Sequence, residues 1–135
     1  MPETTIVKHL DHFNIQTRDM AGTIAFYHDL LGLVARGAPR RDPSERQWLY
    51  AGERAVIHLN LFGTDNTIPR DVQPGAGTGA IHHIAFECDG FDEMLALLKA
   101  RGTDYGYADL SEIGLRQLFV TDPNNVLLEL NFRSA

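Results

Sequence analysis

An internal repeat constrains the fold of this chain more than any other feature of its sequence. A single offset of 71 residues aligns His12 with His83, Trp48 with Phe119, His58 with Glu129, and Asn60 with Asn131. Self-similarity at a fixed offset is typical of folds built from repeated units. At 135 residues the chain is about the length of one ordinary domain. We therefore expect one domain, residues 1–135, built from two similar modules.

Both halves contain the same predicted order of elements, which is strand, helix and three further strands. The first module, about 7–62, has predicted strands at 7–17, 33–38, 46–51 and 55–62. The second module, about 80–132, has them at 80–88, 104–109, 114–121 and 125–132. The first predicted helix runs from Asp19, which can cap it, to Gly32, which can end it in the left-handed conformation. Asp89 and Gly102 bound the second helix in the same way.

The segment 63–79 separates the two modules. It is rich in Gly, Pro, Thr and Asp and has no hydrophobic periodicity, which predicts a linker. A connection of this length in a small domain is often a functional lid, or a hinge that permits exchange between subunits.

The predicted strands have one polar and one apolar face, because side chains two residues apart point to the same side. The polar face holds His12, Asn14, Gln16, His58, Asn60, His83, Glu87, Glu129 and Asn131. The apolar face holds Phe13, Ile15, Ile57, Leu59, Ile84, Phe86, Leu128 and Leu130. Helices covering the apolar face would gain roughly 1.5–3 kcal/mol for each large side chain buried. We therefore expect an α+β fold, in which two βαβββ modules form a curved mixed sheet with a polar cup and outer helices.

Four residues able to bind a metal ion lie on the polar face, namely His12, His58, His83 and Glu129. One histidine alone is usually structural, but four such residues at equal spacing in two repeats rarely arise by chance. Imidazole and carboxylate ligands suit Fe, Mn, Co, Ni or Zn better than Mg or Ca. We expect one divalent transition metal ion per site, acting as a Lewis acid.

Other residues of the polar face are candidates for substrate contacts. The predicted pocket comprises Asn14, Trp48, Asn60, Gln117, Phe119 and Asn131, with Arg46 nearer its mouth. Glu129 and His58 are the candidate catalytic residues, and His58 is either a metal ligand or an acid–base group beside three ligands. Arg116 has the opposite parity and is expected outside the cup. His9, His28 and His82 are interpreted as structural or exposed.

Composition narrows the range of partners. No apolar run approaches the roughly 20 residues that a membrane span requires. The formal net charge of −6 disfavours nucleic acid, and the single cysteine, Cys88, suits a reducing compartment. The first residues, 1–5, lack the features of a signal peptide. We expect a cytoplasmic protein with a small-molecule substrate and no membrane or nucleic-acid partner.

Several longer stretches carry a family resemblance. They are residues 10–13 (LDHF), 26–33 (FYHDLLGL), 82–86 (HHIAF) and 122–130 (DPNNVLLEL). The chain resembles the vicinal oxygen chelate superfamily, the group of glyoxalases, bleomycin-resistance proteins and extradiol dioxygenases. The resemblance implies that the four metal positions are His12, His58, His83 and Glu129.

Two details of the resemblance point toward different reactions. Glyoxalases usually have Glu or Gln where this chain has His58. Extradiol dioxygenases use two His and one carboxylate as iron ligands with a further His nearby, which His58 resembles. They commonly carry a Tyr ten residues before the Glu ligand, where this chain has Phe119.

The sequence leaves more than one function open. One hypothesis is an enzyme, either dioxygenase-like or a glyoxalase-like lyase or isomerase, whose substrate chelates the metal through two adjacent oxygens. The alternative is a metal-free protein that sequesters an antibiotic, as bleomycin-resistance proteins do. A homodimer is expected, because exposed sheet edges and the linker suit pairing, and the site can lie within one chain or be shared by two.

Overall fold

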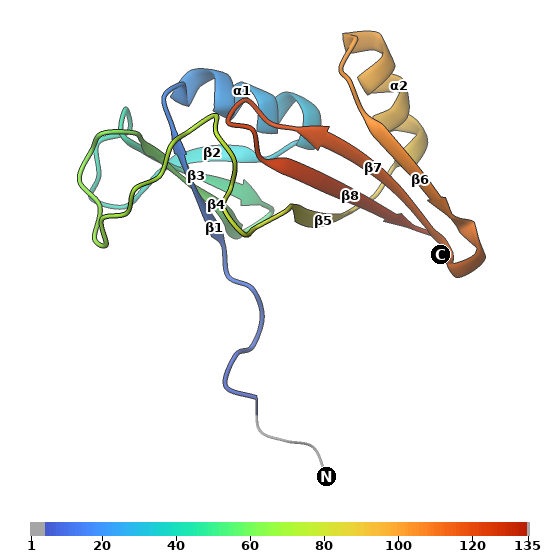
Figure 1. Cartoon of the computed structure of the whole chain (residues 1–135), viewed down its shortest axis with the longest axis horizontal. Helices are drawn as coiled ribbons and strands as arrows, with labels where there is room; N and C mark the ends of the chain where they lie inside the picture. The colour runs from blue at the N-terminus through green and yellow to red at the C-terminus, as the bar shows by residue number, and fades with distance from the viewer. Residues whose placement is uncertain (1–4, 135) are drawn as a thin grey trace.

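The computed structural model describes residues 5–134 and contains two modules with the same order of elements (Figure 1). The first comprises β1 (Phe13–Thr17), α1 (Met20–Leu31), β2 (Val34–Gly37), β3 (Arg46–Ala51) and β4 (Arg54–Leu61). The second comprises β5 (Ile84–Cys88), α2 (Phe91–Arg101), β6 (Gly106–Leu110), the 3-10 turn η1 (Ser111–Ile113), β7 (Leu115–Thr121) and β8 (Leu127–Arg133). The predicted α+β class and the two βαβββ modules are confirmed.

Each module forms its own four-stranded mixed sheet. The strand orders are β1-β4-β3-β2 and β5-β8-β7-β6, and the two sheets are not hydrogen-bonded to each other. The first strand of each module runs parallel to the last, and the other pairs are antiparallel. Registers correspond as well, because Trp48 lies opposite His58 and Phe119 lies opposite Glu129. The repeat in the sequence is therefore also a repeat in three dimensions.

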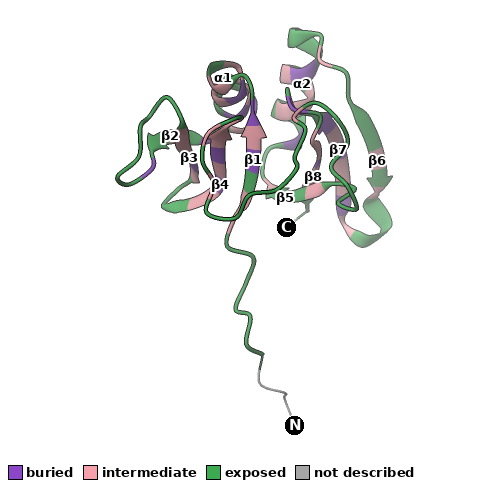
Figure 2. Cartoon of the chain, turned by 60° about the vertical axis from the view of Figure 1, so that its left-hand side comes forward, coloured by how far each residue is buried: buried purple, intermediate pink, exposed green. Residues whose placement is uncertain are grey.

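The alternation of faces follows the prediction. On β4, Ile57 and Leu59 are fully buried, whereas His58 between them is only partly buried. On β8, Leu128 and Leu130 are fully buried on either side of the partly buried Glu129. Both helices lie over the apolar side of the sheets (Figure 1), and buried residues gather between sheets and helices (Figure 2). The helices thus leave the polar face uncovered.

Helix ends agree with the sequence in three of four cases. Asp19 caps α1 by accepting a hydrogen bond from the Gly22 N–H at 2.9 Å. Gly32 and Gly102 end the two helices with φ of 72° and 64°, which favours glycine. The expected role of Asp89 is wrong, because Gly90 occupies the N-cap position with φ of 84° and no side-chain hydrogen bond.

The predicted starts of the first strands, at residues 7 and 80, are also wrong. Observed pairing begins at Phe13 with Ile57 and at Ile84 with Leu128. For the second module the reason is that Ile84 lies opposite Leu128 and β8 begins at Leu127, so residues before His83 have no neighbouring strand to pair with. His12 and His83 therefore each lie one residue before a strand.

The modules are joined by a buried polar contact and a shared core. The Tyr27 hydroxyl on α1 donates to Asp122 Oδ2 in the β7–β8 turn at 2.7 Å, and both residues are buried. Asn124 of the same turn donates to the Thr23 hydroxyl at 2.9 Å. Buried apolar side chains of both modules belong to one hydrophobic cluster. No helix within residues 5–134 is long and apolar enough to cross a bilayer.

Candidate metal centre

In the first module, three aromatic rings stack on the polar face. The His58 ring lies between Trp48 and His12, with centroid separations of 4.2 and 3.6 Å and interplanar angles of 8° and 12°. Burial, and secondarily the nearby His12, lower the pKa of His58 to about 4. His58 is therefore neutral at pH 7, which leaves one ring nitrogen with a free lone pair.

In the second module, a chain of side-chain hydrogen bonds leads to Glu129. Gln117 Nε2 donates to Asn131 Oδ1 at 3.0 Å, and Asn131 Nδ2 donates to Glu129 Oε2 at 3.0 Å. The other carboxylate oxygen, Glu129 Oε1, lies 3.5 Å from His83 Nε2. The carboxylate is thus held with one oxygen occupied by Asn131 and the other directed toward His83.

The four predicted ligands form two pairs, one in each module. His12 contacts His58, and His83 contacts Glu129. Within residues 5–134, no three His, Cys, Asp or Glu side chains lie close enough together to hold one metal ion. Each pair offers nitrogen or oxygen donors of the kind that transition metals prefer, so the donor chemistry fits such an ion. A complete shell requires donors beyond either pair.

Part of the linker lies on the polar face of the first module. The Asn66 side-chain oxygen accepts hydrogen bonds from Asn60 Nδ2 at 2.7 Å and from Gln16 Nε2 at 3.2 Å. The Arg46 guanidinium donates to the Thr64 hydroxyl and to the Asp65 carbonyl. The linker therefore covers polar side chains that the sequence predicted to face a substrate.

A pocket of about 270 Å³ lies between this part of the linker, the β2–β3 loop and the sheet. It is lined by Ala38, Pro39, Arg41, Arg46, Trp48, His58, Asn60, Asp65, Asn66 and Thr67. Four predicted residues, Arg46, Trp48, His58 and Asn60, thus share one cavity. A second hollow of about 250 Å³, beside Cys88 and Phe91, contains none of the predicted site residues.

The remaining predicted residues lie outside that pocket. Asn14 is exposed and its oxygen accepts a hydrogen bond from Gln16 Nε2 at 3.2 Å. Phe119 is partly buried on β7 between Gly106 and Glu129. Arg116 lies over the Phe91 ring at 3.8 Å, on the side of α2, as its parity predicted.

Sequence reasoning missed residues that contact the candidate ligands from the adjacent position. Asp11 Oδ2 accepts a hydrogen bond from His12 Nδ1 at 2.5 Å. His82 Nδ1 lies 2.9 Å from His83 Nδ1. Their position in the sequence could have identified them, because each residue directly precedes a candidate ligand. Asn66 and Arg41 carried no such signal, because both lie in segments without periodicity.

Comparison with known proteins identifies the family. A sequence model described as the Glyoxalase/Bleomycin resistance protein/Dioxygenase superfamily matches residues 9–130. The chain belongs to this superfamily. The resemblance inferred from the sequence is confirmed, and the match spans both modules and the linker.

Individual proteins resemble the chain in sequence or in structure. The chain is 28% identical over 123 residues to Glyoxylase I 4 of Arabidopsis thaliana, covering 90% of this chain and 68% of the relative. Integron cassette protein VCH_CASS1 of V. cholerae has a similar structure, with a TM-score of 0.76, 20% identity and coverage of 98% and 100%. So does lactoylglutathione lyase of Agrobacterium tumefaciens, with a TM-score of 0.67, 19% identity and coverage of 95% and 96%. At these identities the two structures establish likeness of fold.

Proposed function

We propose that the protein is a divalent-metal-dependent enzyme of the glyoxalase-like lyase or isomerase type, acting on a small substrate with two adjacent oxygens. The proposal is based on the orientation of the Glu129 carboxylate. Its carboxylate is held by Asn131 on the polar face, with Oε1 directed toward His83. The similarity to Glyoxylase I 4 supports the same choice.

The proposed metal ligands are His12, His58, His83 and Glu129, and the ion is Fe, Mn, Ni, Co or Zn. When bound, the ion would act as a Lewis acid on the substrate oxygens and acidify the neighbouring C–H bond. Glu129 would accept that proton and return it to the adjacent carbon, which is the proton movement an isomerase requires. Asn131, as a donor to the other oxygen, orients the carboxylate for this transfer.

The substrate would enter the pocket beside His58. Trp48 supplies an apolar wall, and Asn60 and Arg46 supply hydrogen-bond donors. Because the linker occupies these donors through Thr64, Asp65 and Asn66, substrate binding would displace or rearrange that segment. The linker is thus proposed to act as a lid.

A dioxygenase is the second candidate, and His58 favours it. In a dioxygenase, the iron would be held by two histidines and one carboxylate, which are His12, His83 and Glu129. His58, neutral at pH 7, serves as the acid–base residue beside them.

The full ligand set would be completed either within one chain or by a second copy. A homodimer is proposed because residues 5–12 extend away from the body of the molecule (Figure 1) and carry exposed apolar side chains. Ile6 is 94% exposed and Leu10 is 72% exposed. Burial of such side chains against another copy would stabilise a dimer. Sedimentation analysis of the full chain tests this directly.

Metal analysis of protein purified without chelators tests the proposed function. About one transition metal ion per chain is expected, and its identity discriminates the candidates, since iron favours oxygen chemistry and nickel or zinc favours lyase or isomerase chemistry. Activity is then assayed with a hemithioacetal and with a catechol. Metal-free protein that also fails to bind added Co²⁺ would contradict both enzyme hypotheses and favour a sequestering protein.

A further inference from the structure

The two candidate histidine ligands that precede β1 and β5 have different neighbours at the same position of the repeat. Asp11 precedes His12, and His82 precedes His83. In both modules the preceding side chain contacts Nδ1 of the following histidine, at 2.5 and 2.9 Å. The contact recurs, but its chemistry does not, because one neighbour is a carboxylate and the other an imidazole.

The Asp11 contact determines where the His12 proton lies. An ionised carboxylate has no hydrogen to donate, so His12 must donate from Nδ1. With the proton of the neutral ring on Nδ1, Nε2 carries the free lone pair.

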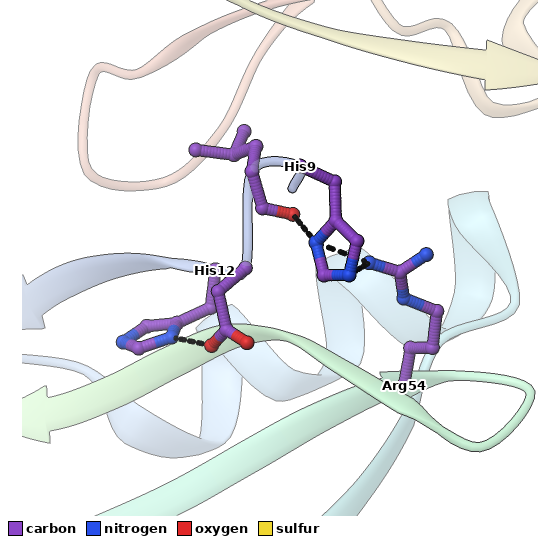
Figure 3. A network of polar contacts seen from close by, with 5 residues as sticks. His9, His12 and Arg54 are labelled. Carbon is purple, nitrogen blue, oxygen red and sulfur yellow. Dashed lines mark hydrogen bonds and ion pairs between the residues drawn. The ribbon is translucent and has the colours of Figure 1, made fainter. Parts of the chain in front are cut away.

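The segment that carries Asp11 is itself attached to the sheet. The Arg54 guanidinium, at the start of β4, lies 3.1 Å from Nδ1 and 3.5 Å from Nε2 of His9. Figure 3 shows the contact between Arg54 and His9, with His12 nearby. His9 Nδ1 also lies 3.2 Å from the Leu10 carbonyl, which can only accept, whereas the guanidinium can only donate. Whichever His9 nitrogen accepts from Arg54 therefore does so through its lone pair. This contact fixes the turn from which Asp11 reaches His12.

The second module has no carboxylate at the position equivalent to Asp11, where His82 stands instead. His82 can either donate to or accept from His83, because a neutral imidazole has one nitrogen of each kind. Glu129 Oε1 also lies 3.5 Å from His83 Nε2 and attracts a proton to that nitrogen. The position of the His83 proton is therefore not determined by its neighbour.

We propose that Asp11 is a positioning residue for His12, whose carboxylate keeps the ring proton on Nδ1 and leaves Nε2 free for a ligand on the polar face. The inference rests on the proposed function only in taking that ligand to be a metal ion. Carboxylates that orient metal-binding histidines in this way typically contribute 10–100-fold to metal affinity. The first module is thus prepared for a ligand before any ligand arrives.

The test measures the proton position in metal-free protein. Long-range ¹H–¹⁵N correlation spectra of the chelator-treated full chain at pH 8 distinguish the two forms of each neutral histidine. We expect His12 to carry its proton on Nδ1 in the wild type and in Asp11→Asn, whose amide oxygen still accepts. Asp11→Ala should move the proton toward Nε2. Because the Asp11 side chain is 80% exposed, these variants should fold normally.

His82→Ala is the matched control at the equivalent position of the second module. It should leave the His12 spectrum unchanged and alter only that of His83. A His12 spectrum that is identical in the wild type and Asp11→Ala overturns the inference, as does an Nε2-protonated His12 in the wild type.

A Co²⁺ titration separates this inference from the proposed function. We expect Asp11→Ala to weaken Co²⁺ binding about 10–100-fold, and Asp11→Asn to weaken it less. Wild-type protein that binds no Co²⁺ while His12 still depends on Asp11 would contradict the metal site and leave the positioning role intact. Equal Co²⁺ affinity in the wild type and Asp11→Ala would contradict the positioning role.

Discussion

The two modules share a backbone plan but use equivalent polar pairs for different purposes. In the second module, Gln117 and Asn131 form a chain of hydrogen bonds that ends on Glu129. Arg46 and Asn60 occupy the corresponding positions in the first module, where they bind the linker instead. The second module therefore presents an oriented carboxylate, whereas the first presents stacked imidazoles beneath a lid. On the proposed function, both modules would supply metal ligands, the second with its carboxylate oriented by Asn131 and the first beneath a linker that covers the substrate pocket.

Removal of the carboxylate should have the largest effect. Glu129→Ala deletes a proposed ligand, so we expect Co²⁺ affinity to fall by more than about 100-fold, which is roughly 2.7 kcal/mol. Isothermal titration measures the change. Glu87→Ala, which removes the exposed carboxylate on β5, is the control. An equal loss of Co²⁺ affinity in both variants would show that the loss follows from the change in net charge and not from removal of a ligand.

Substitution of Asn60 and Asn131, which are equivalent in the repeat, tests whether the first contacts only the linker and the second orients Glu129. Asn131→Ala frees the Glu129 carboxylate and should weaken Co²⁺ binding about tenfold. Asn60→Ala should leave Co²⁺ binding nearly unchanged and instead loosen the linker at Asn66, seen as faster backbone hydrogen exchange there. If Asn60→Ala and Asn131→Ala weaken Co²⁺ binding by the same factor, the two asparagines do not have different roles.

The contact between modules should contribute a smaller amount to stability. Burial raises the pKa of Tyr27, so its hydroxyl remains a donor to Asp122 at ordinary pH. Tyr27→Phe should lower the free energy of unfolding by about 1 kcal/mol in urea titrations. Asp122 keeps its hydrogen bonds from the backbone of Asn124 and Val126, which limits the loss. Tyr107→Phe, at an exposed site, should have no effect.

The smallest expected effect concerns pH. Because the pKa of His58 is lowered from 6.5 to about 4, the unfolded chain takes up a proton at this site before the folded chain does. The stabilising contribution of neutral His58 is complete above pH 6.5 and declines as the pH falls toward 4. Metal-free His58→Gln should lose less stability than the wild type between pH 7.5 and 5, as measured by urea unfolding. Parallel losses would show that His58 titrates normally.

Side-chain alternation and the repeat account for most of what the sequence predicted correctly. A period of two determines which face His58 and Glu129 occupy, and burial of Ile57 and Leu130 leaves only one orientation for each strand. The αL glycines at residues 32 and 102 were recognisable for a similar local reason. These features depend only on neighbouring residues.

The features that sequence reasoning missed depend on contacts between distant segments. The contact of Asn66 with Asn60 joins an aperiodic linker to a strand, and no local pattern specifies it. The separation of the four predicted ligands into two pairs depends on how the modules pack. The repeat predicts that the two modules have the same fold, but it does not predict the distance between their polar faces.

We propose that both modules contribute ligands to one metal site, and the stoichiometry of Co²⁺ binding distinguishes a shared site from two separate ones. Absorption titrations would compare wild-type protein with His12→Ala and Glu129→Ala. We expect one Co²⁺ per chain in the wild type and loss of that ion in both variants. Two ions per chain, with each variant losing only the ion of its own module, would contradict a shared site, as would retention of one ion at unchanged affinity in either variant.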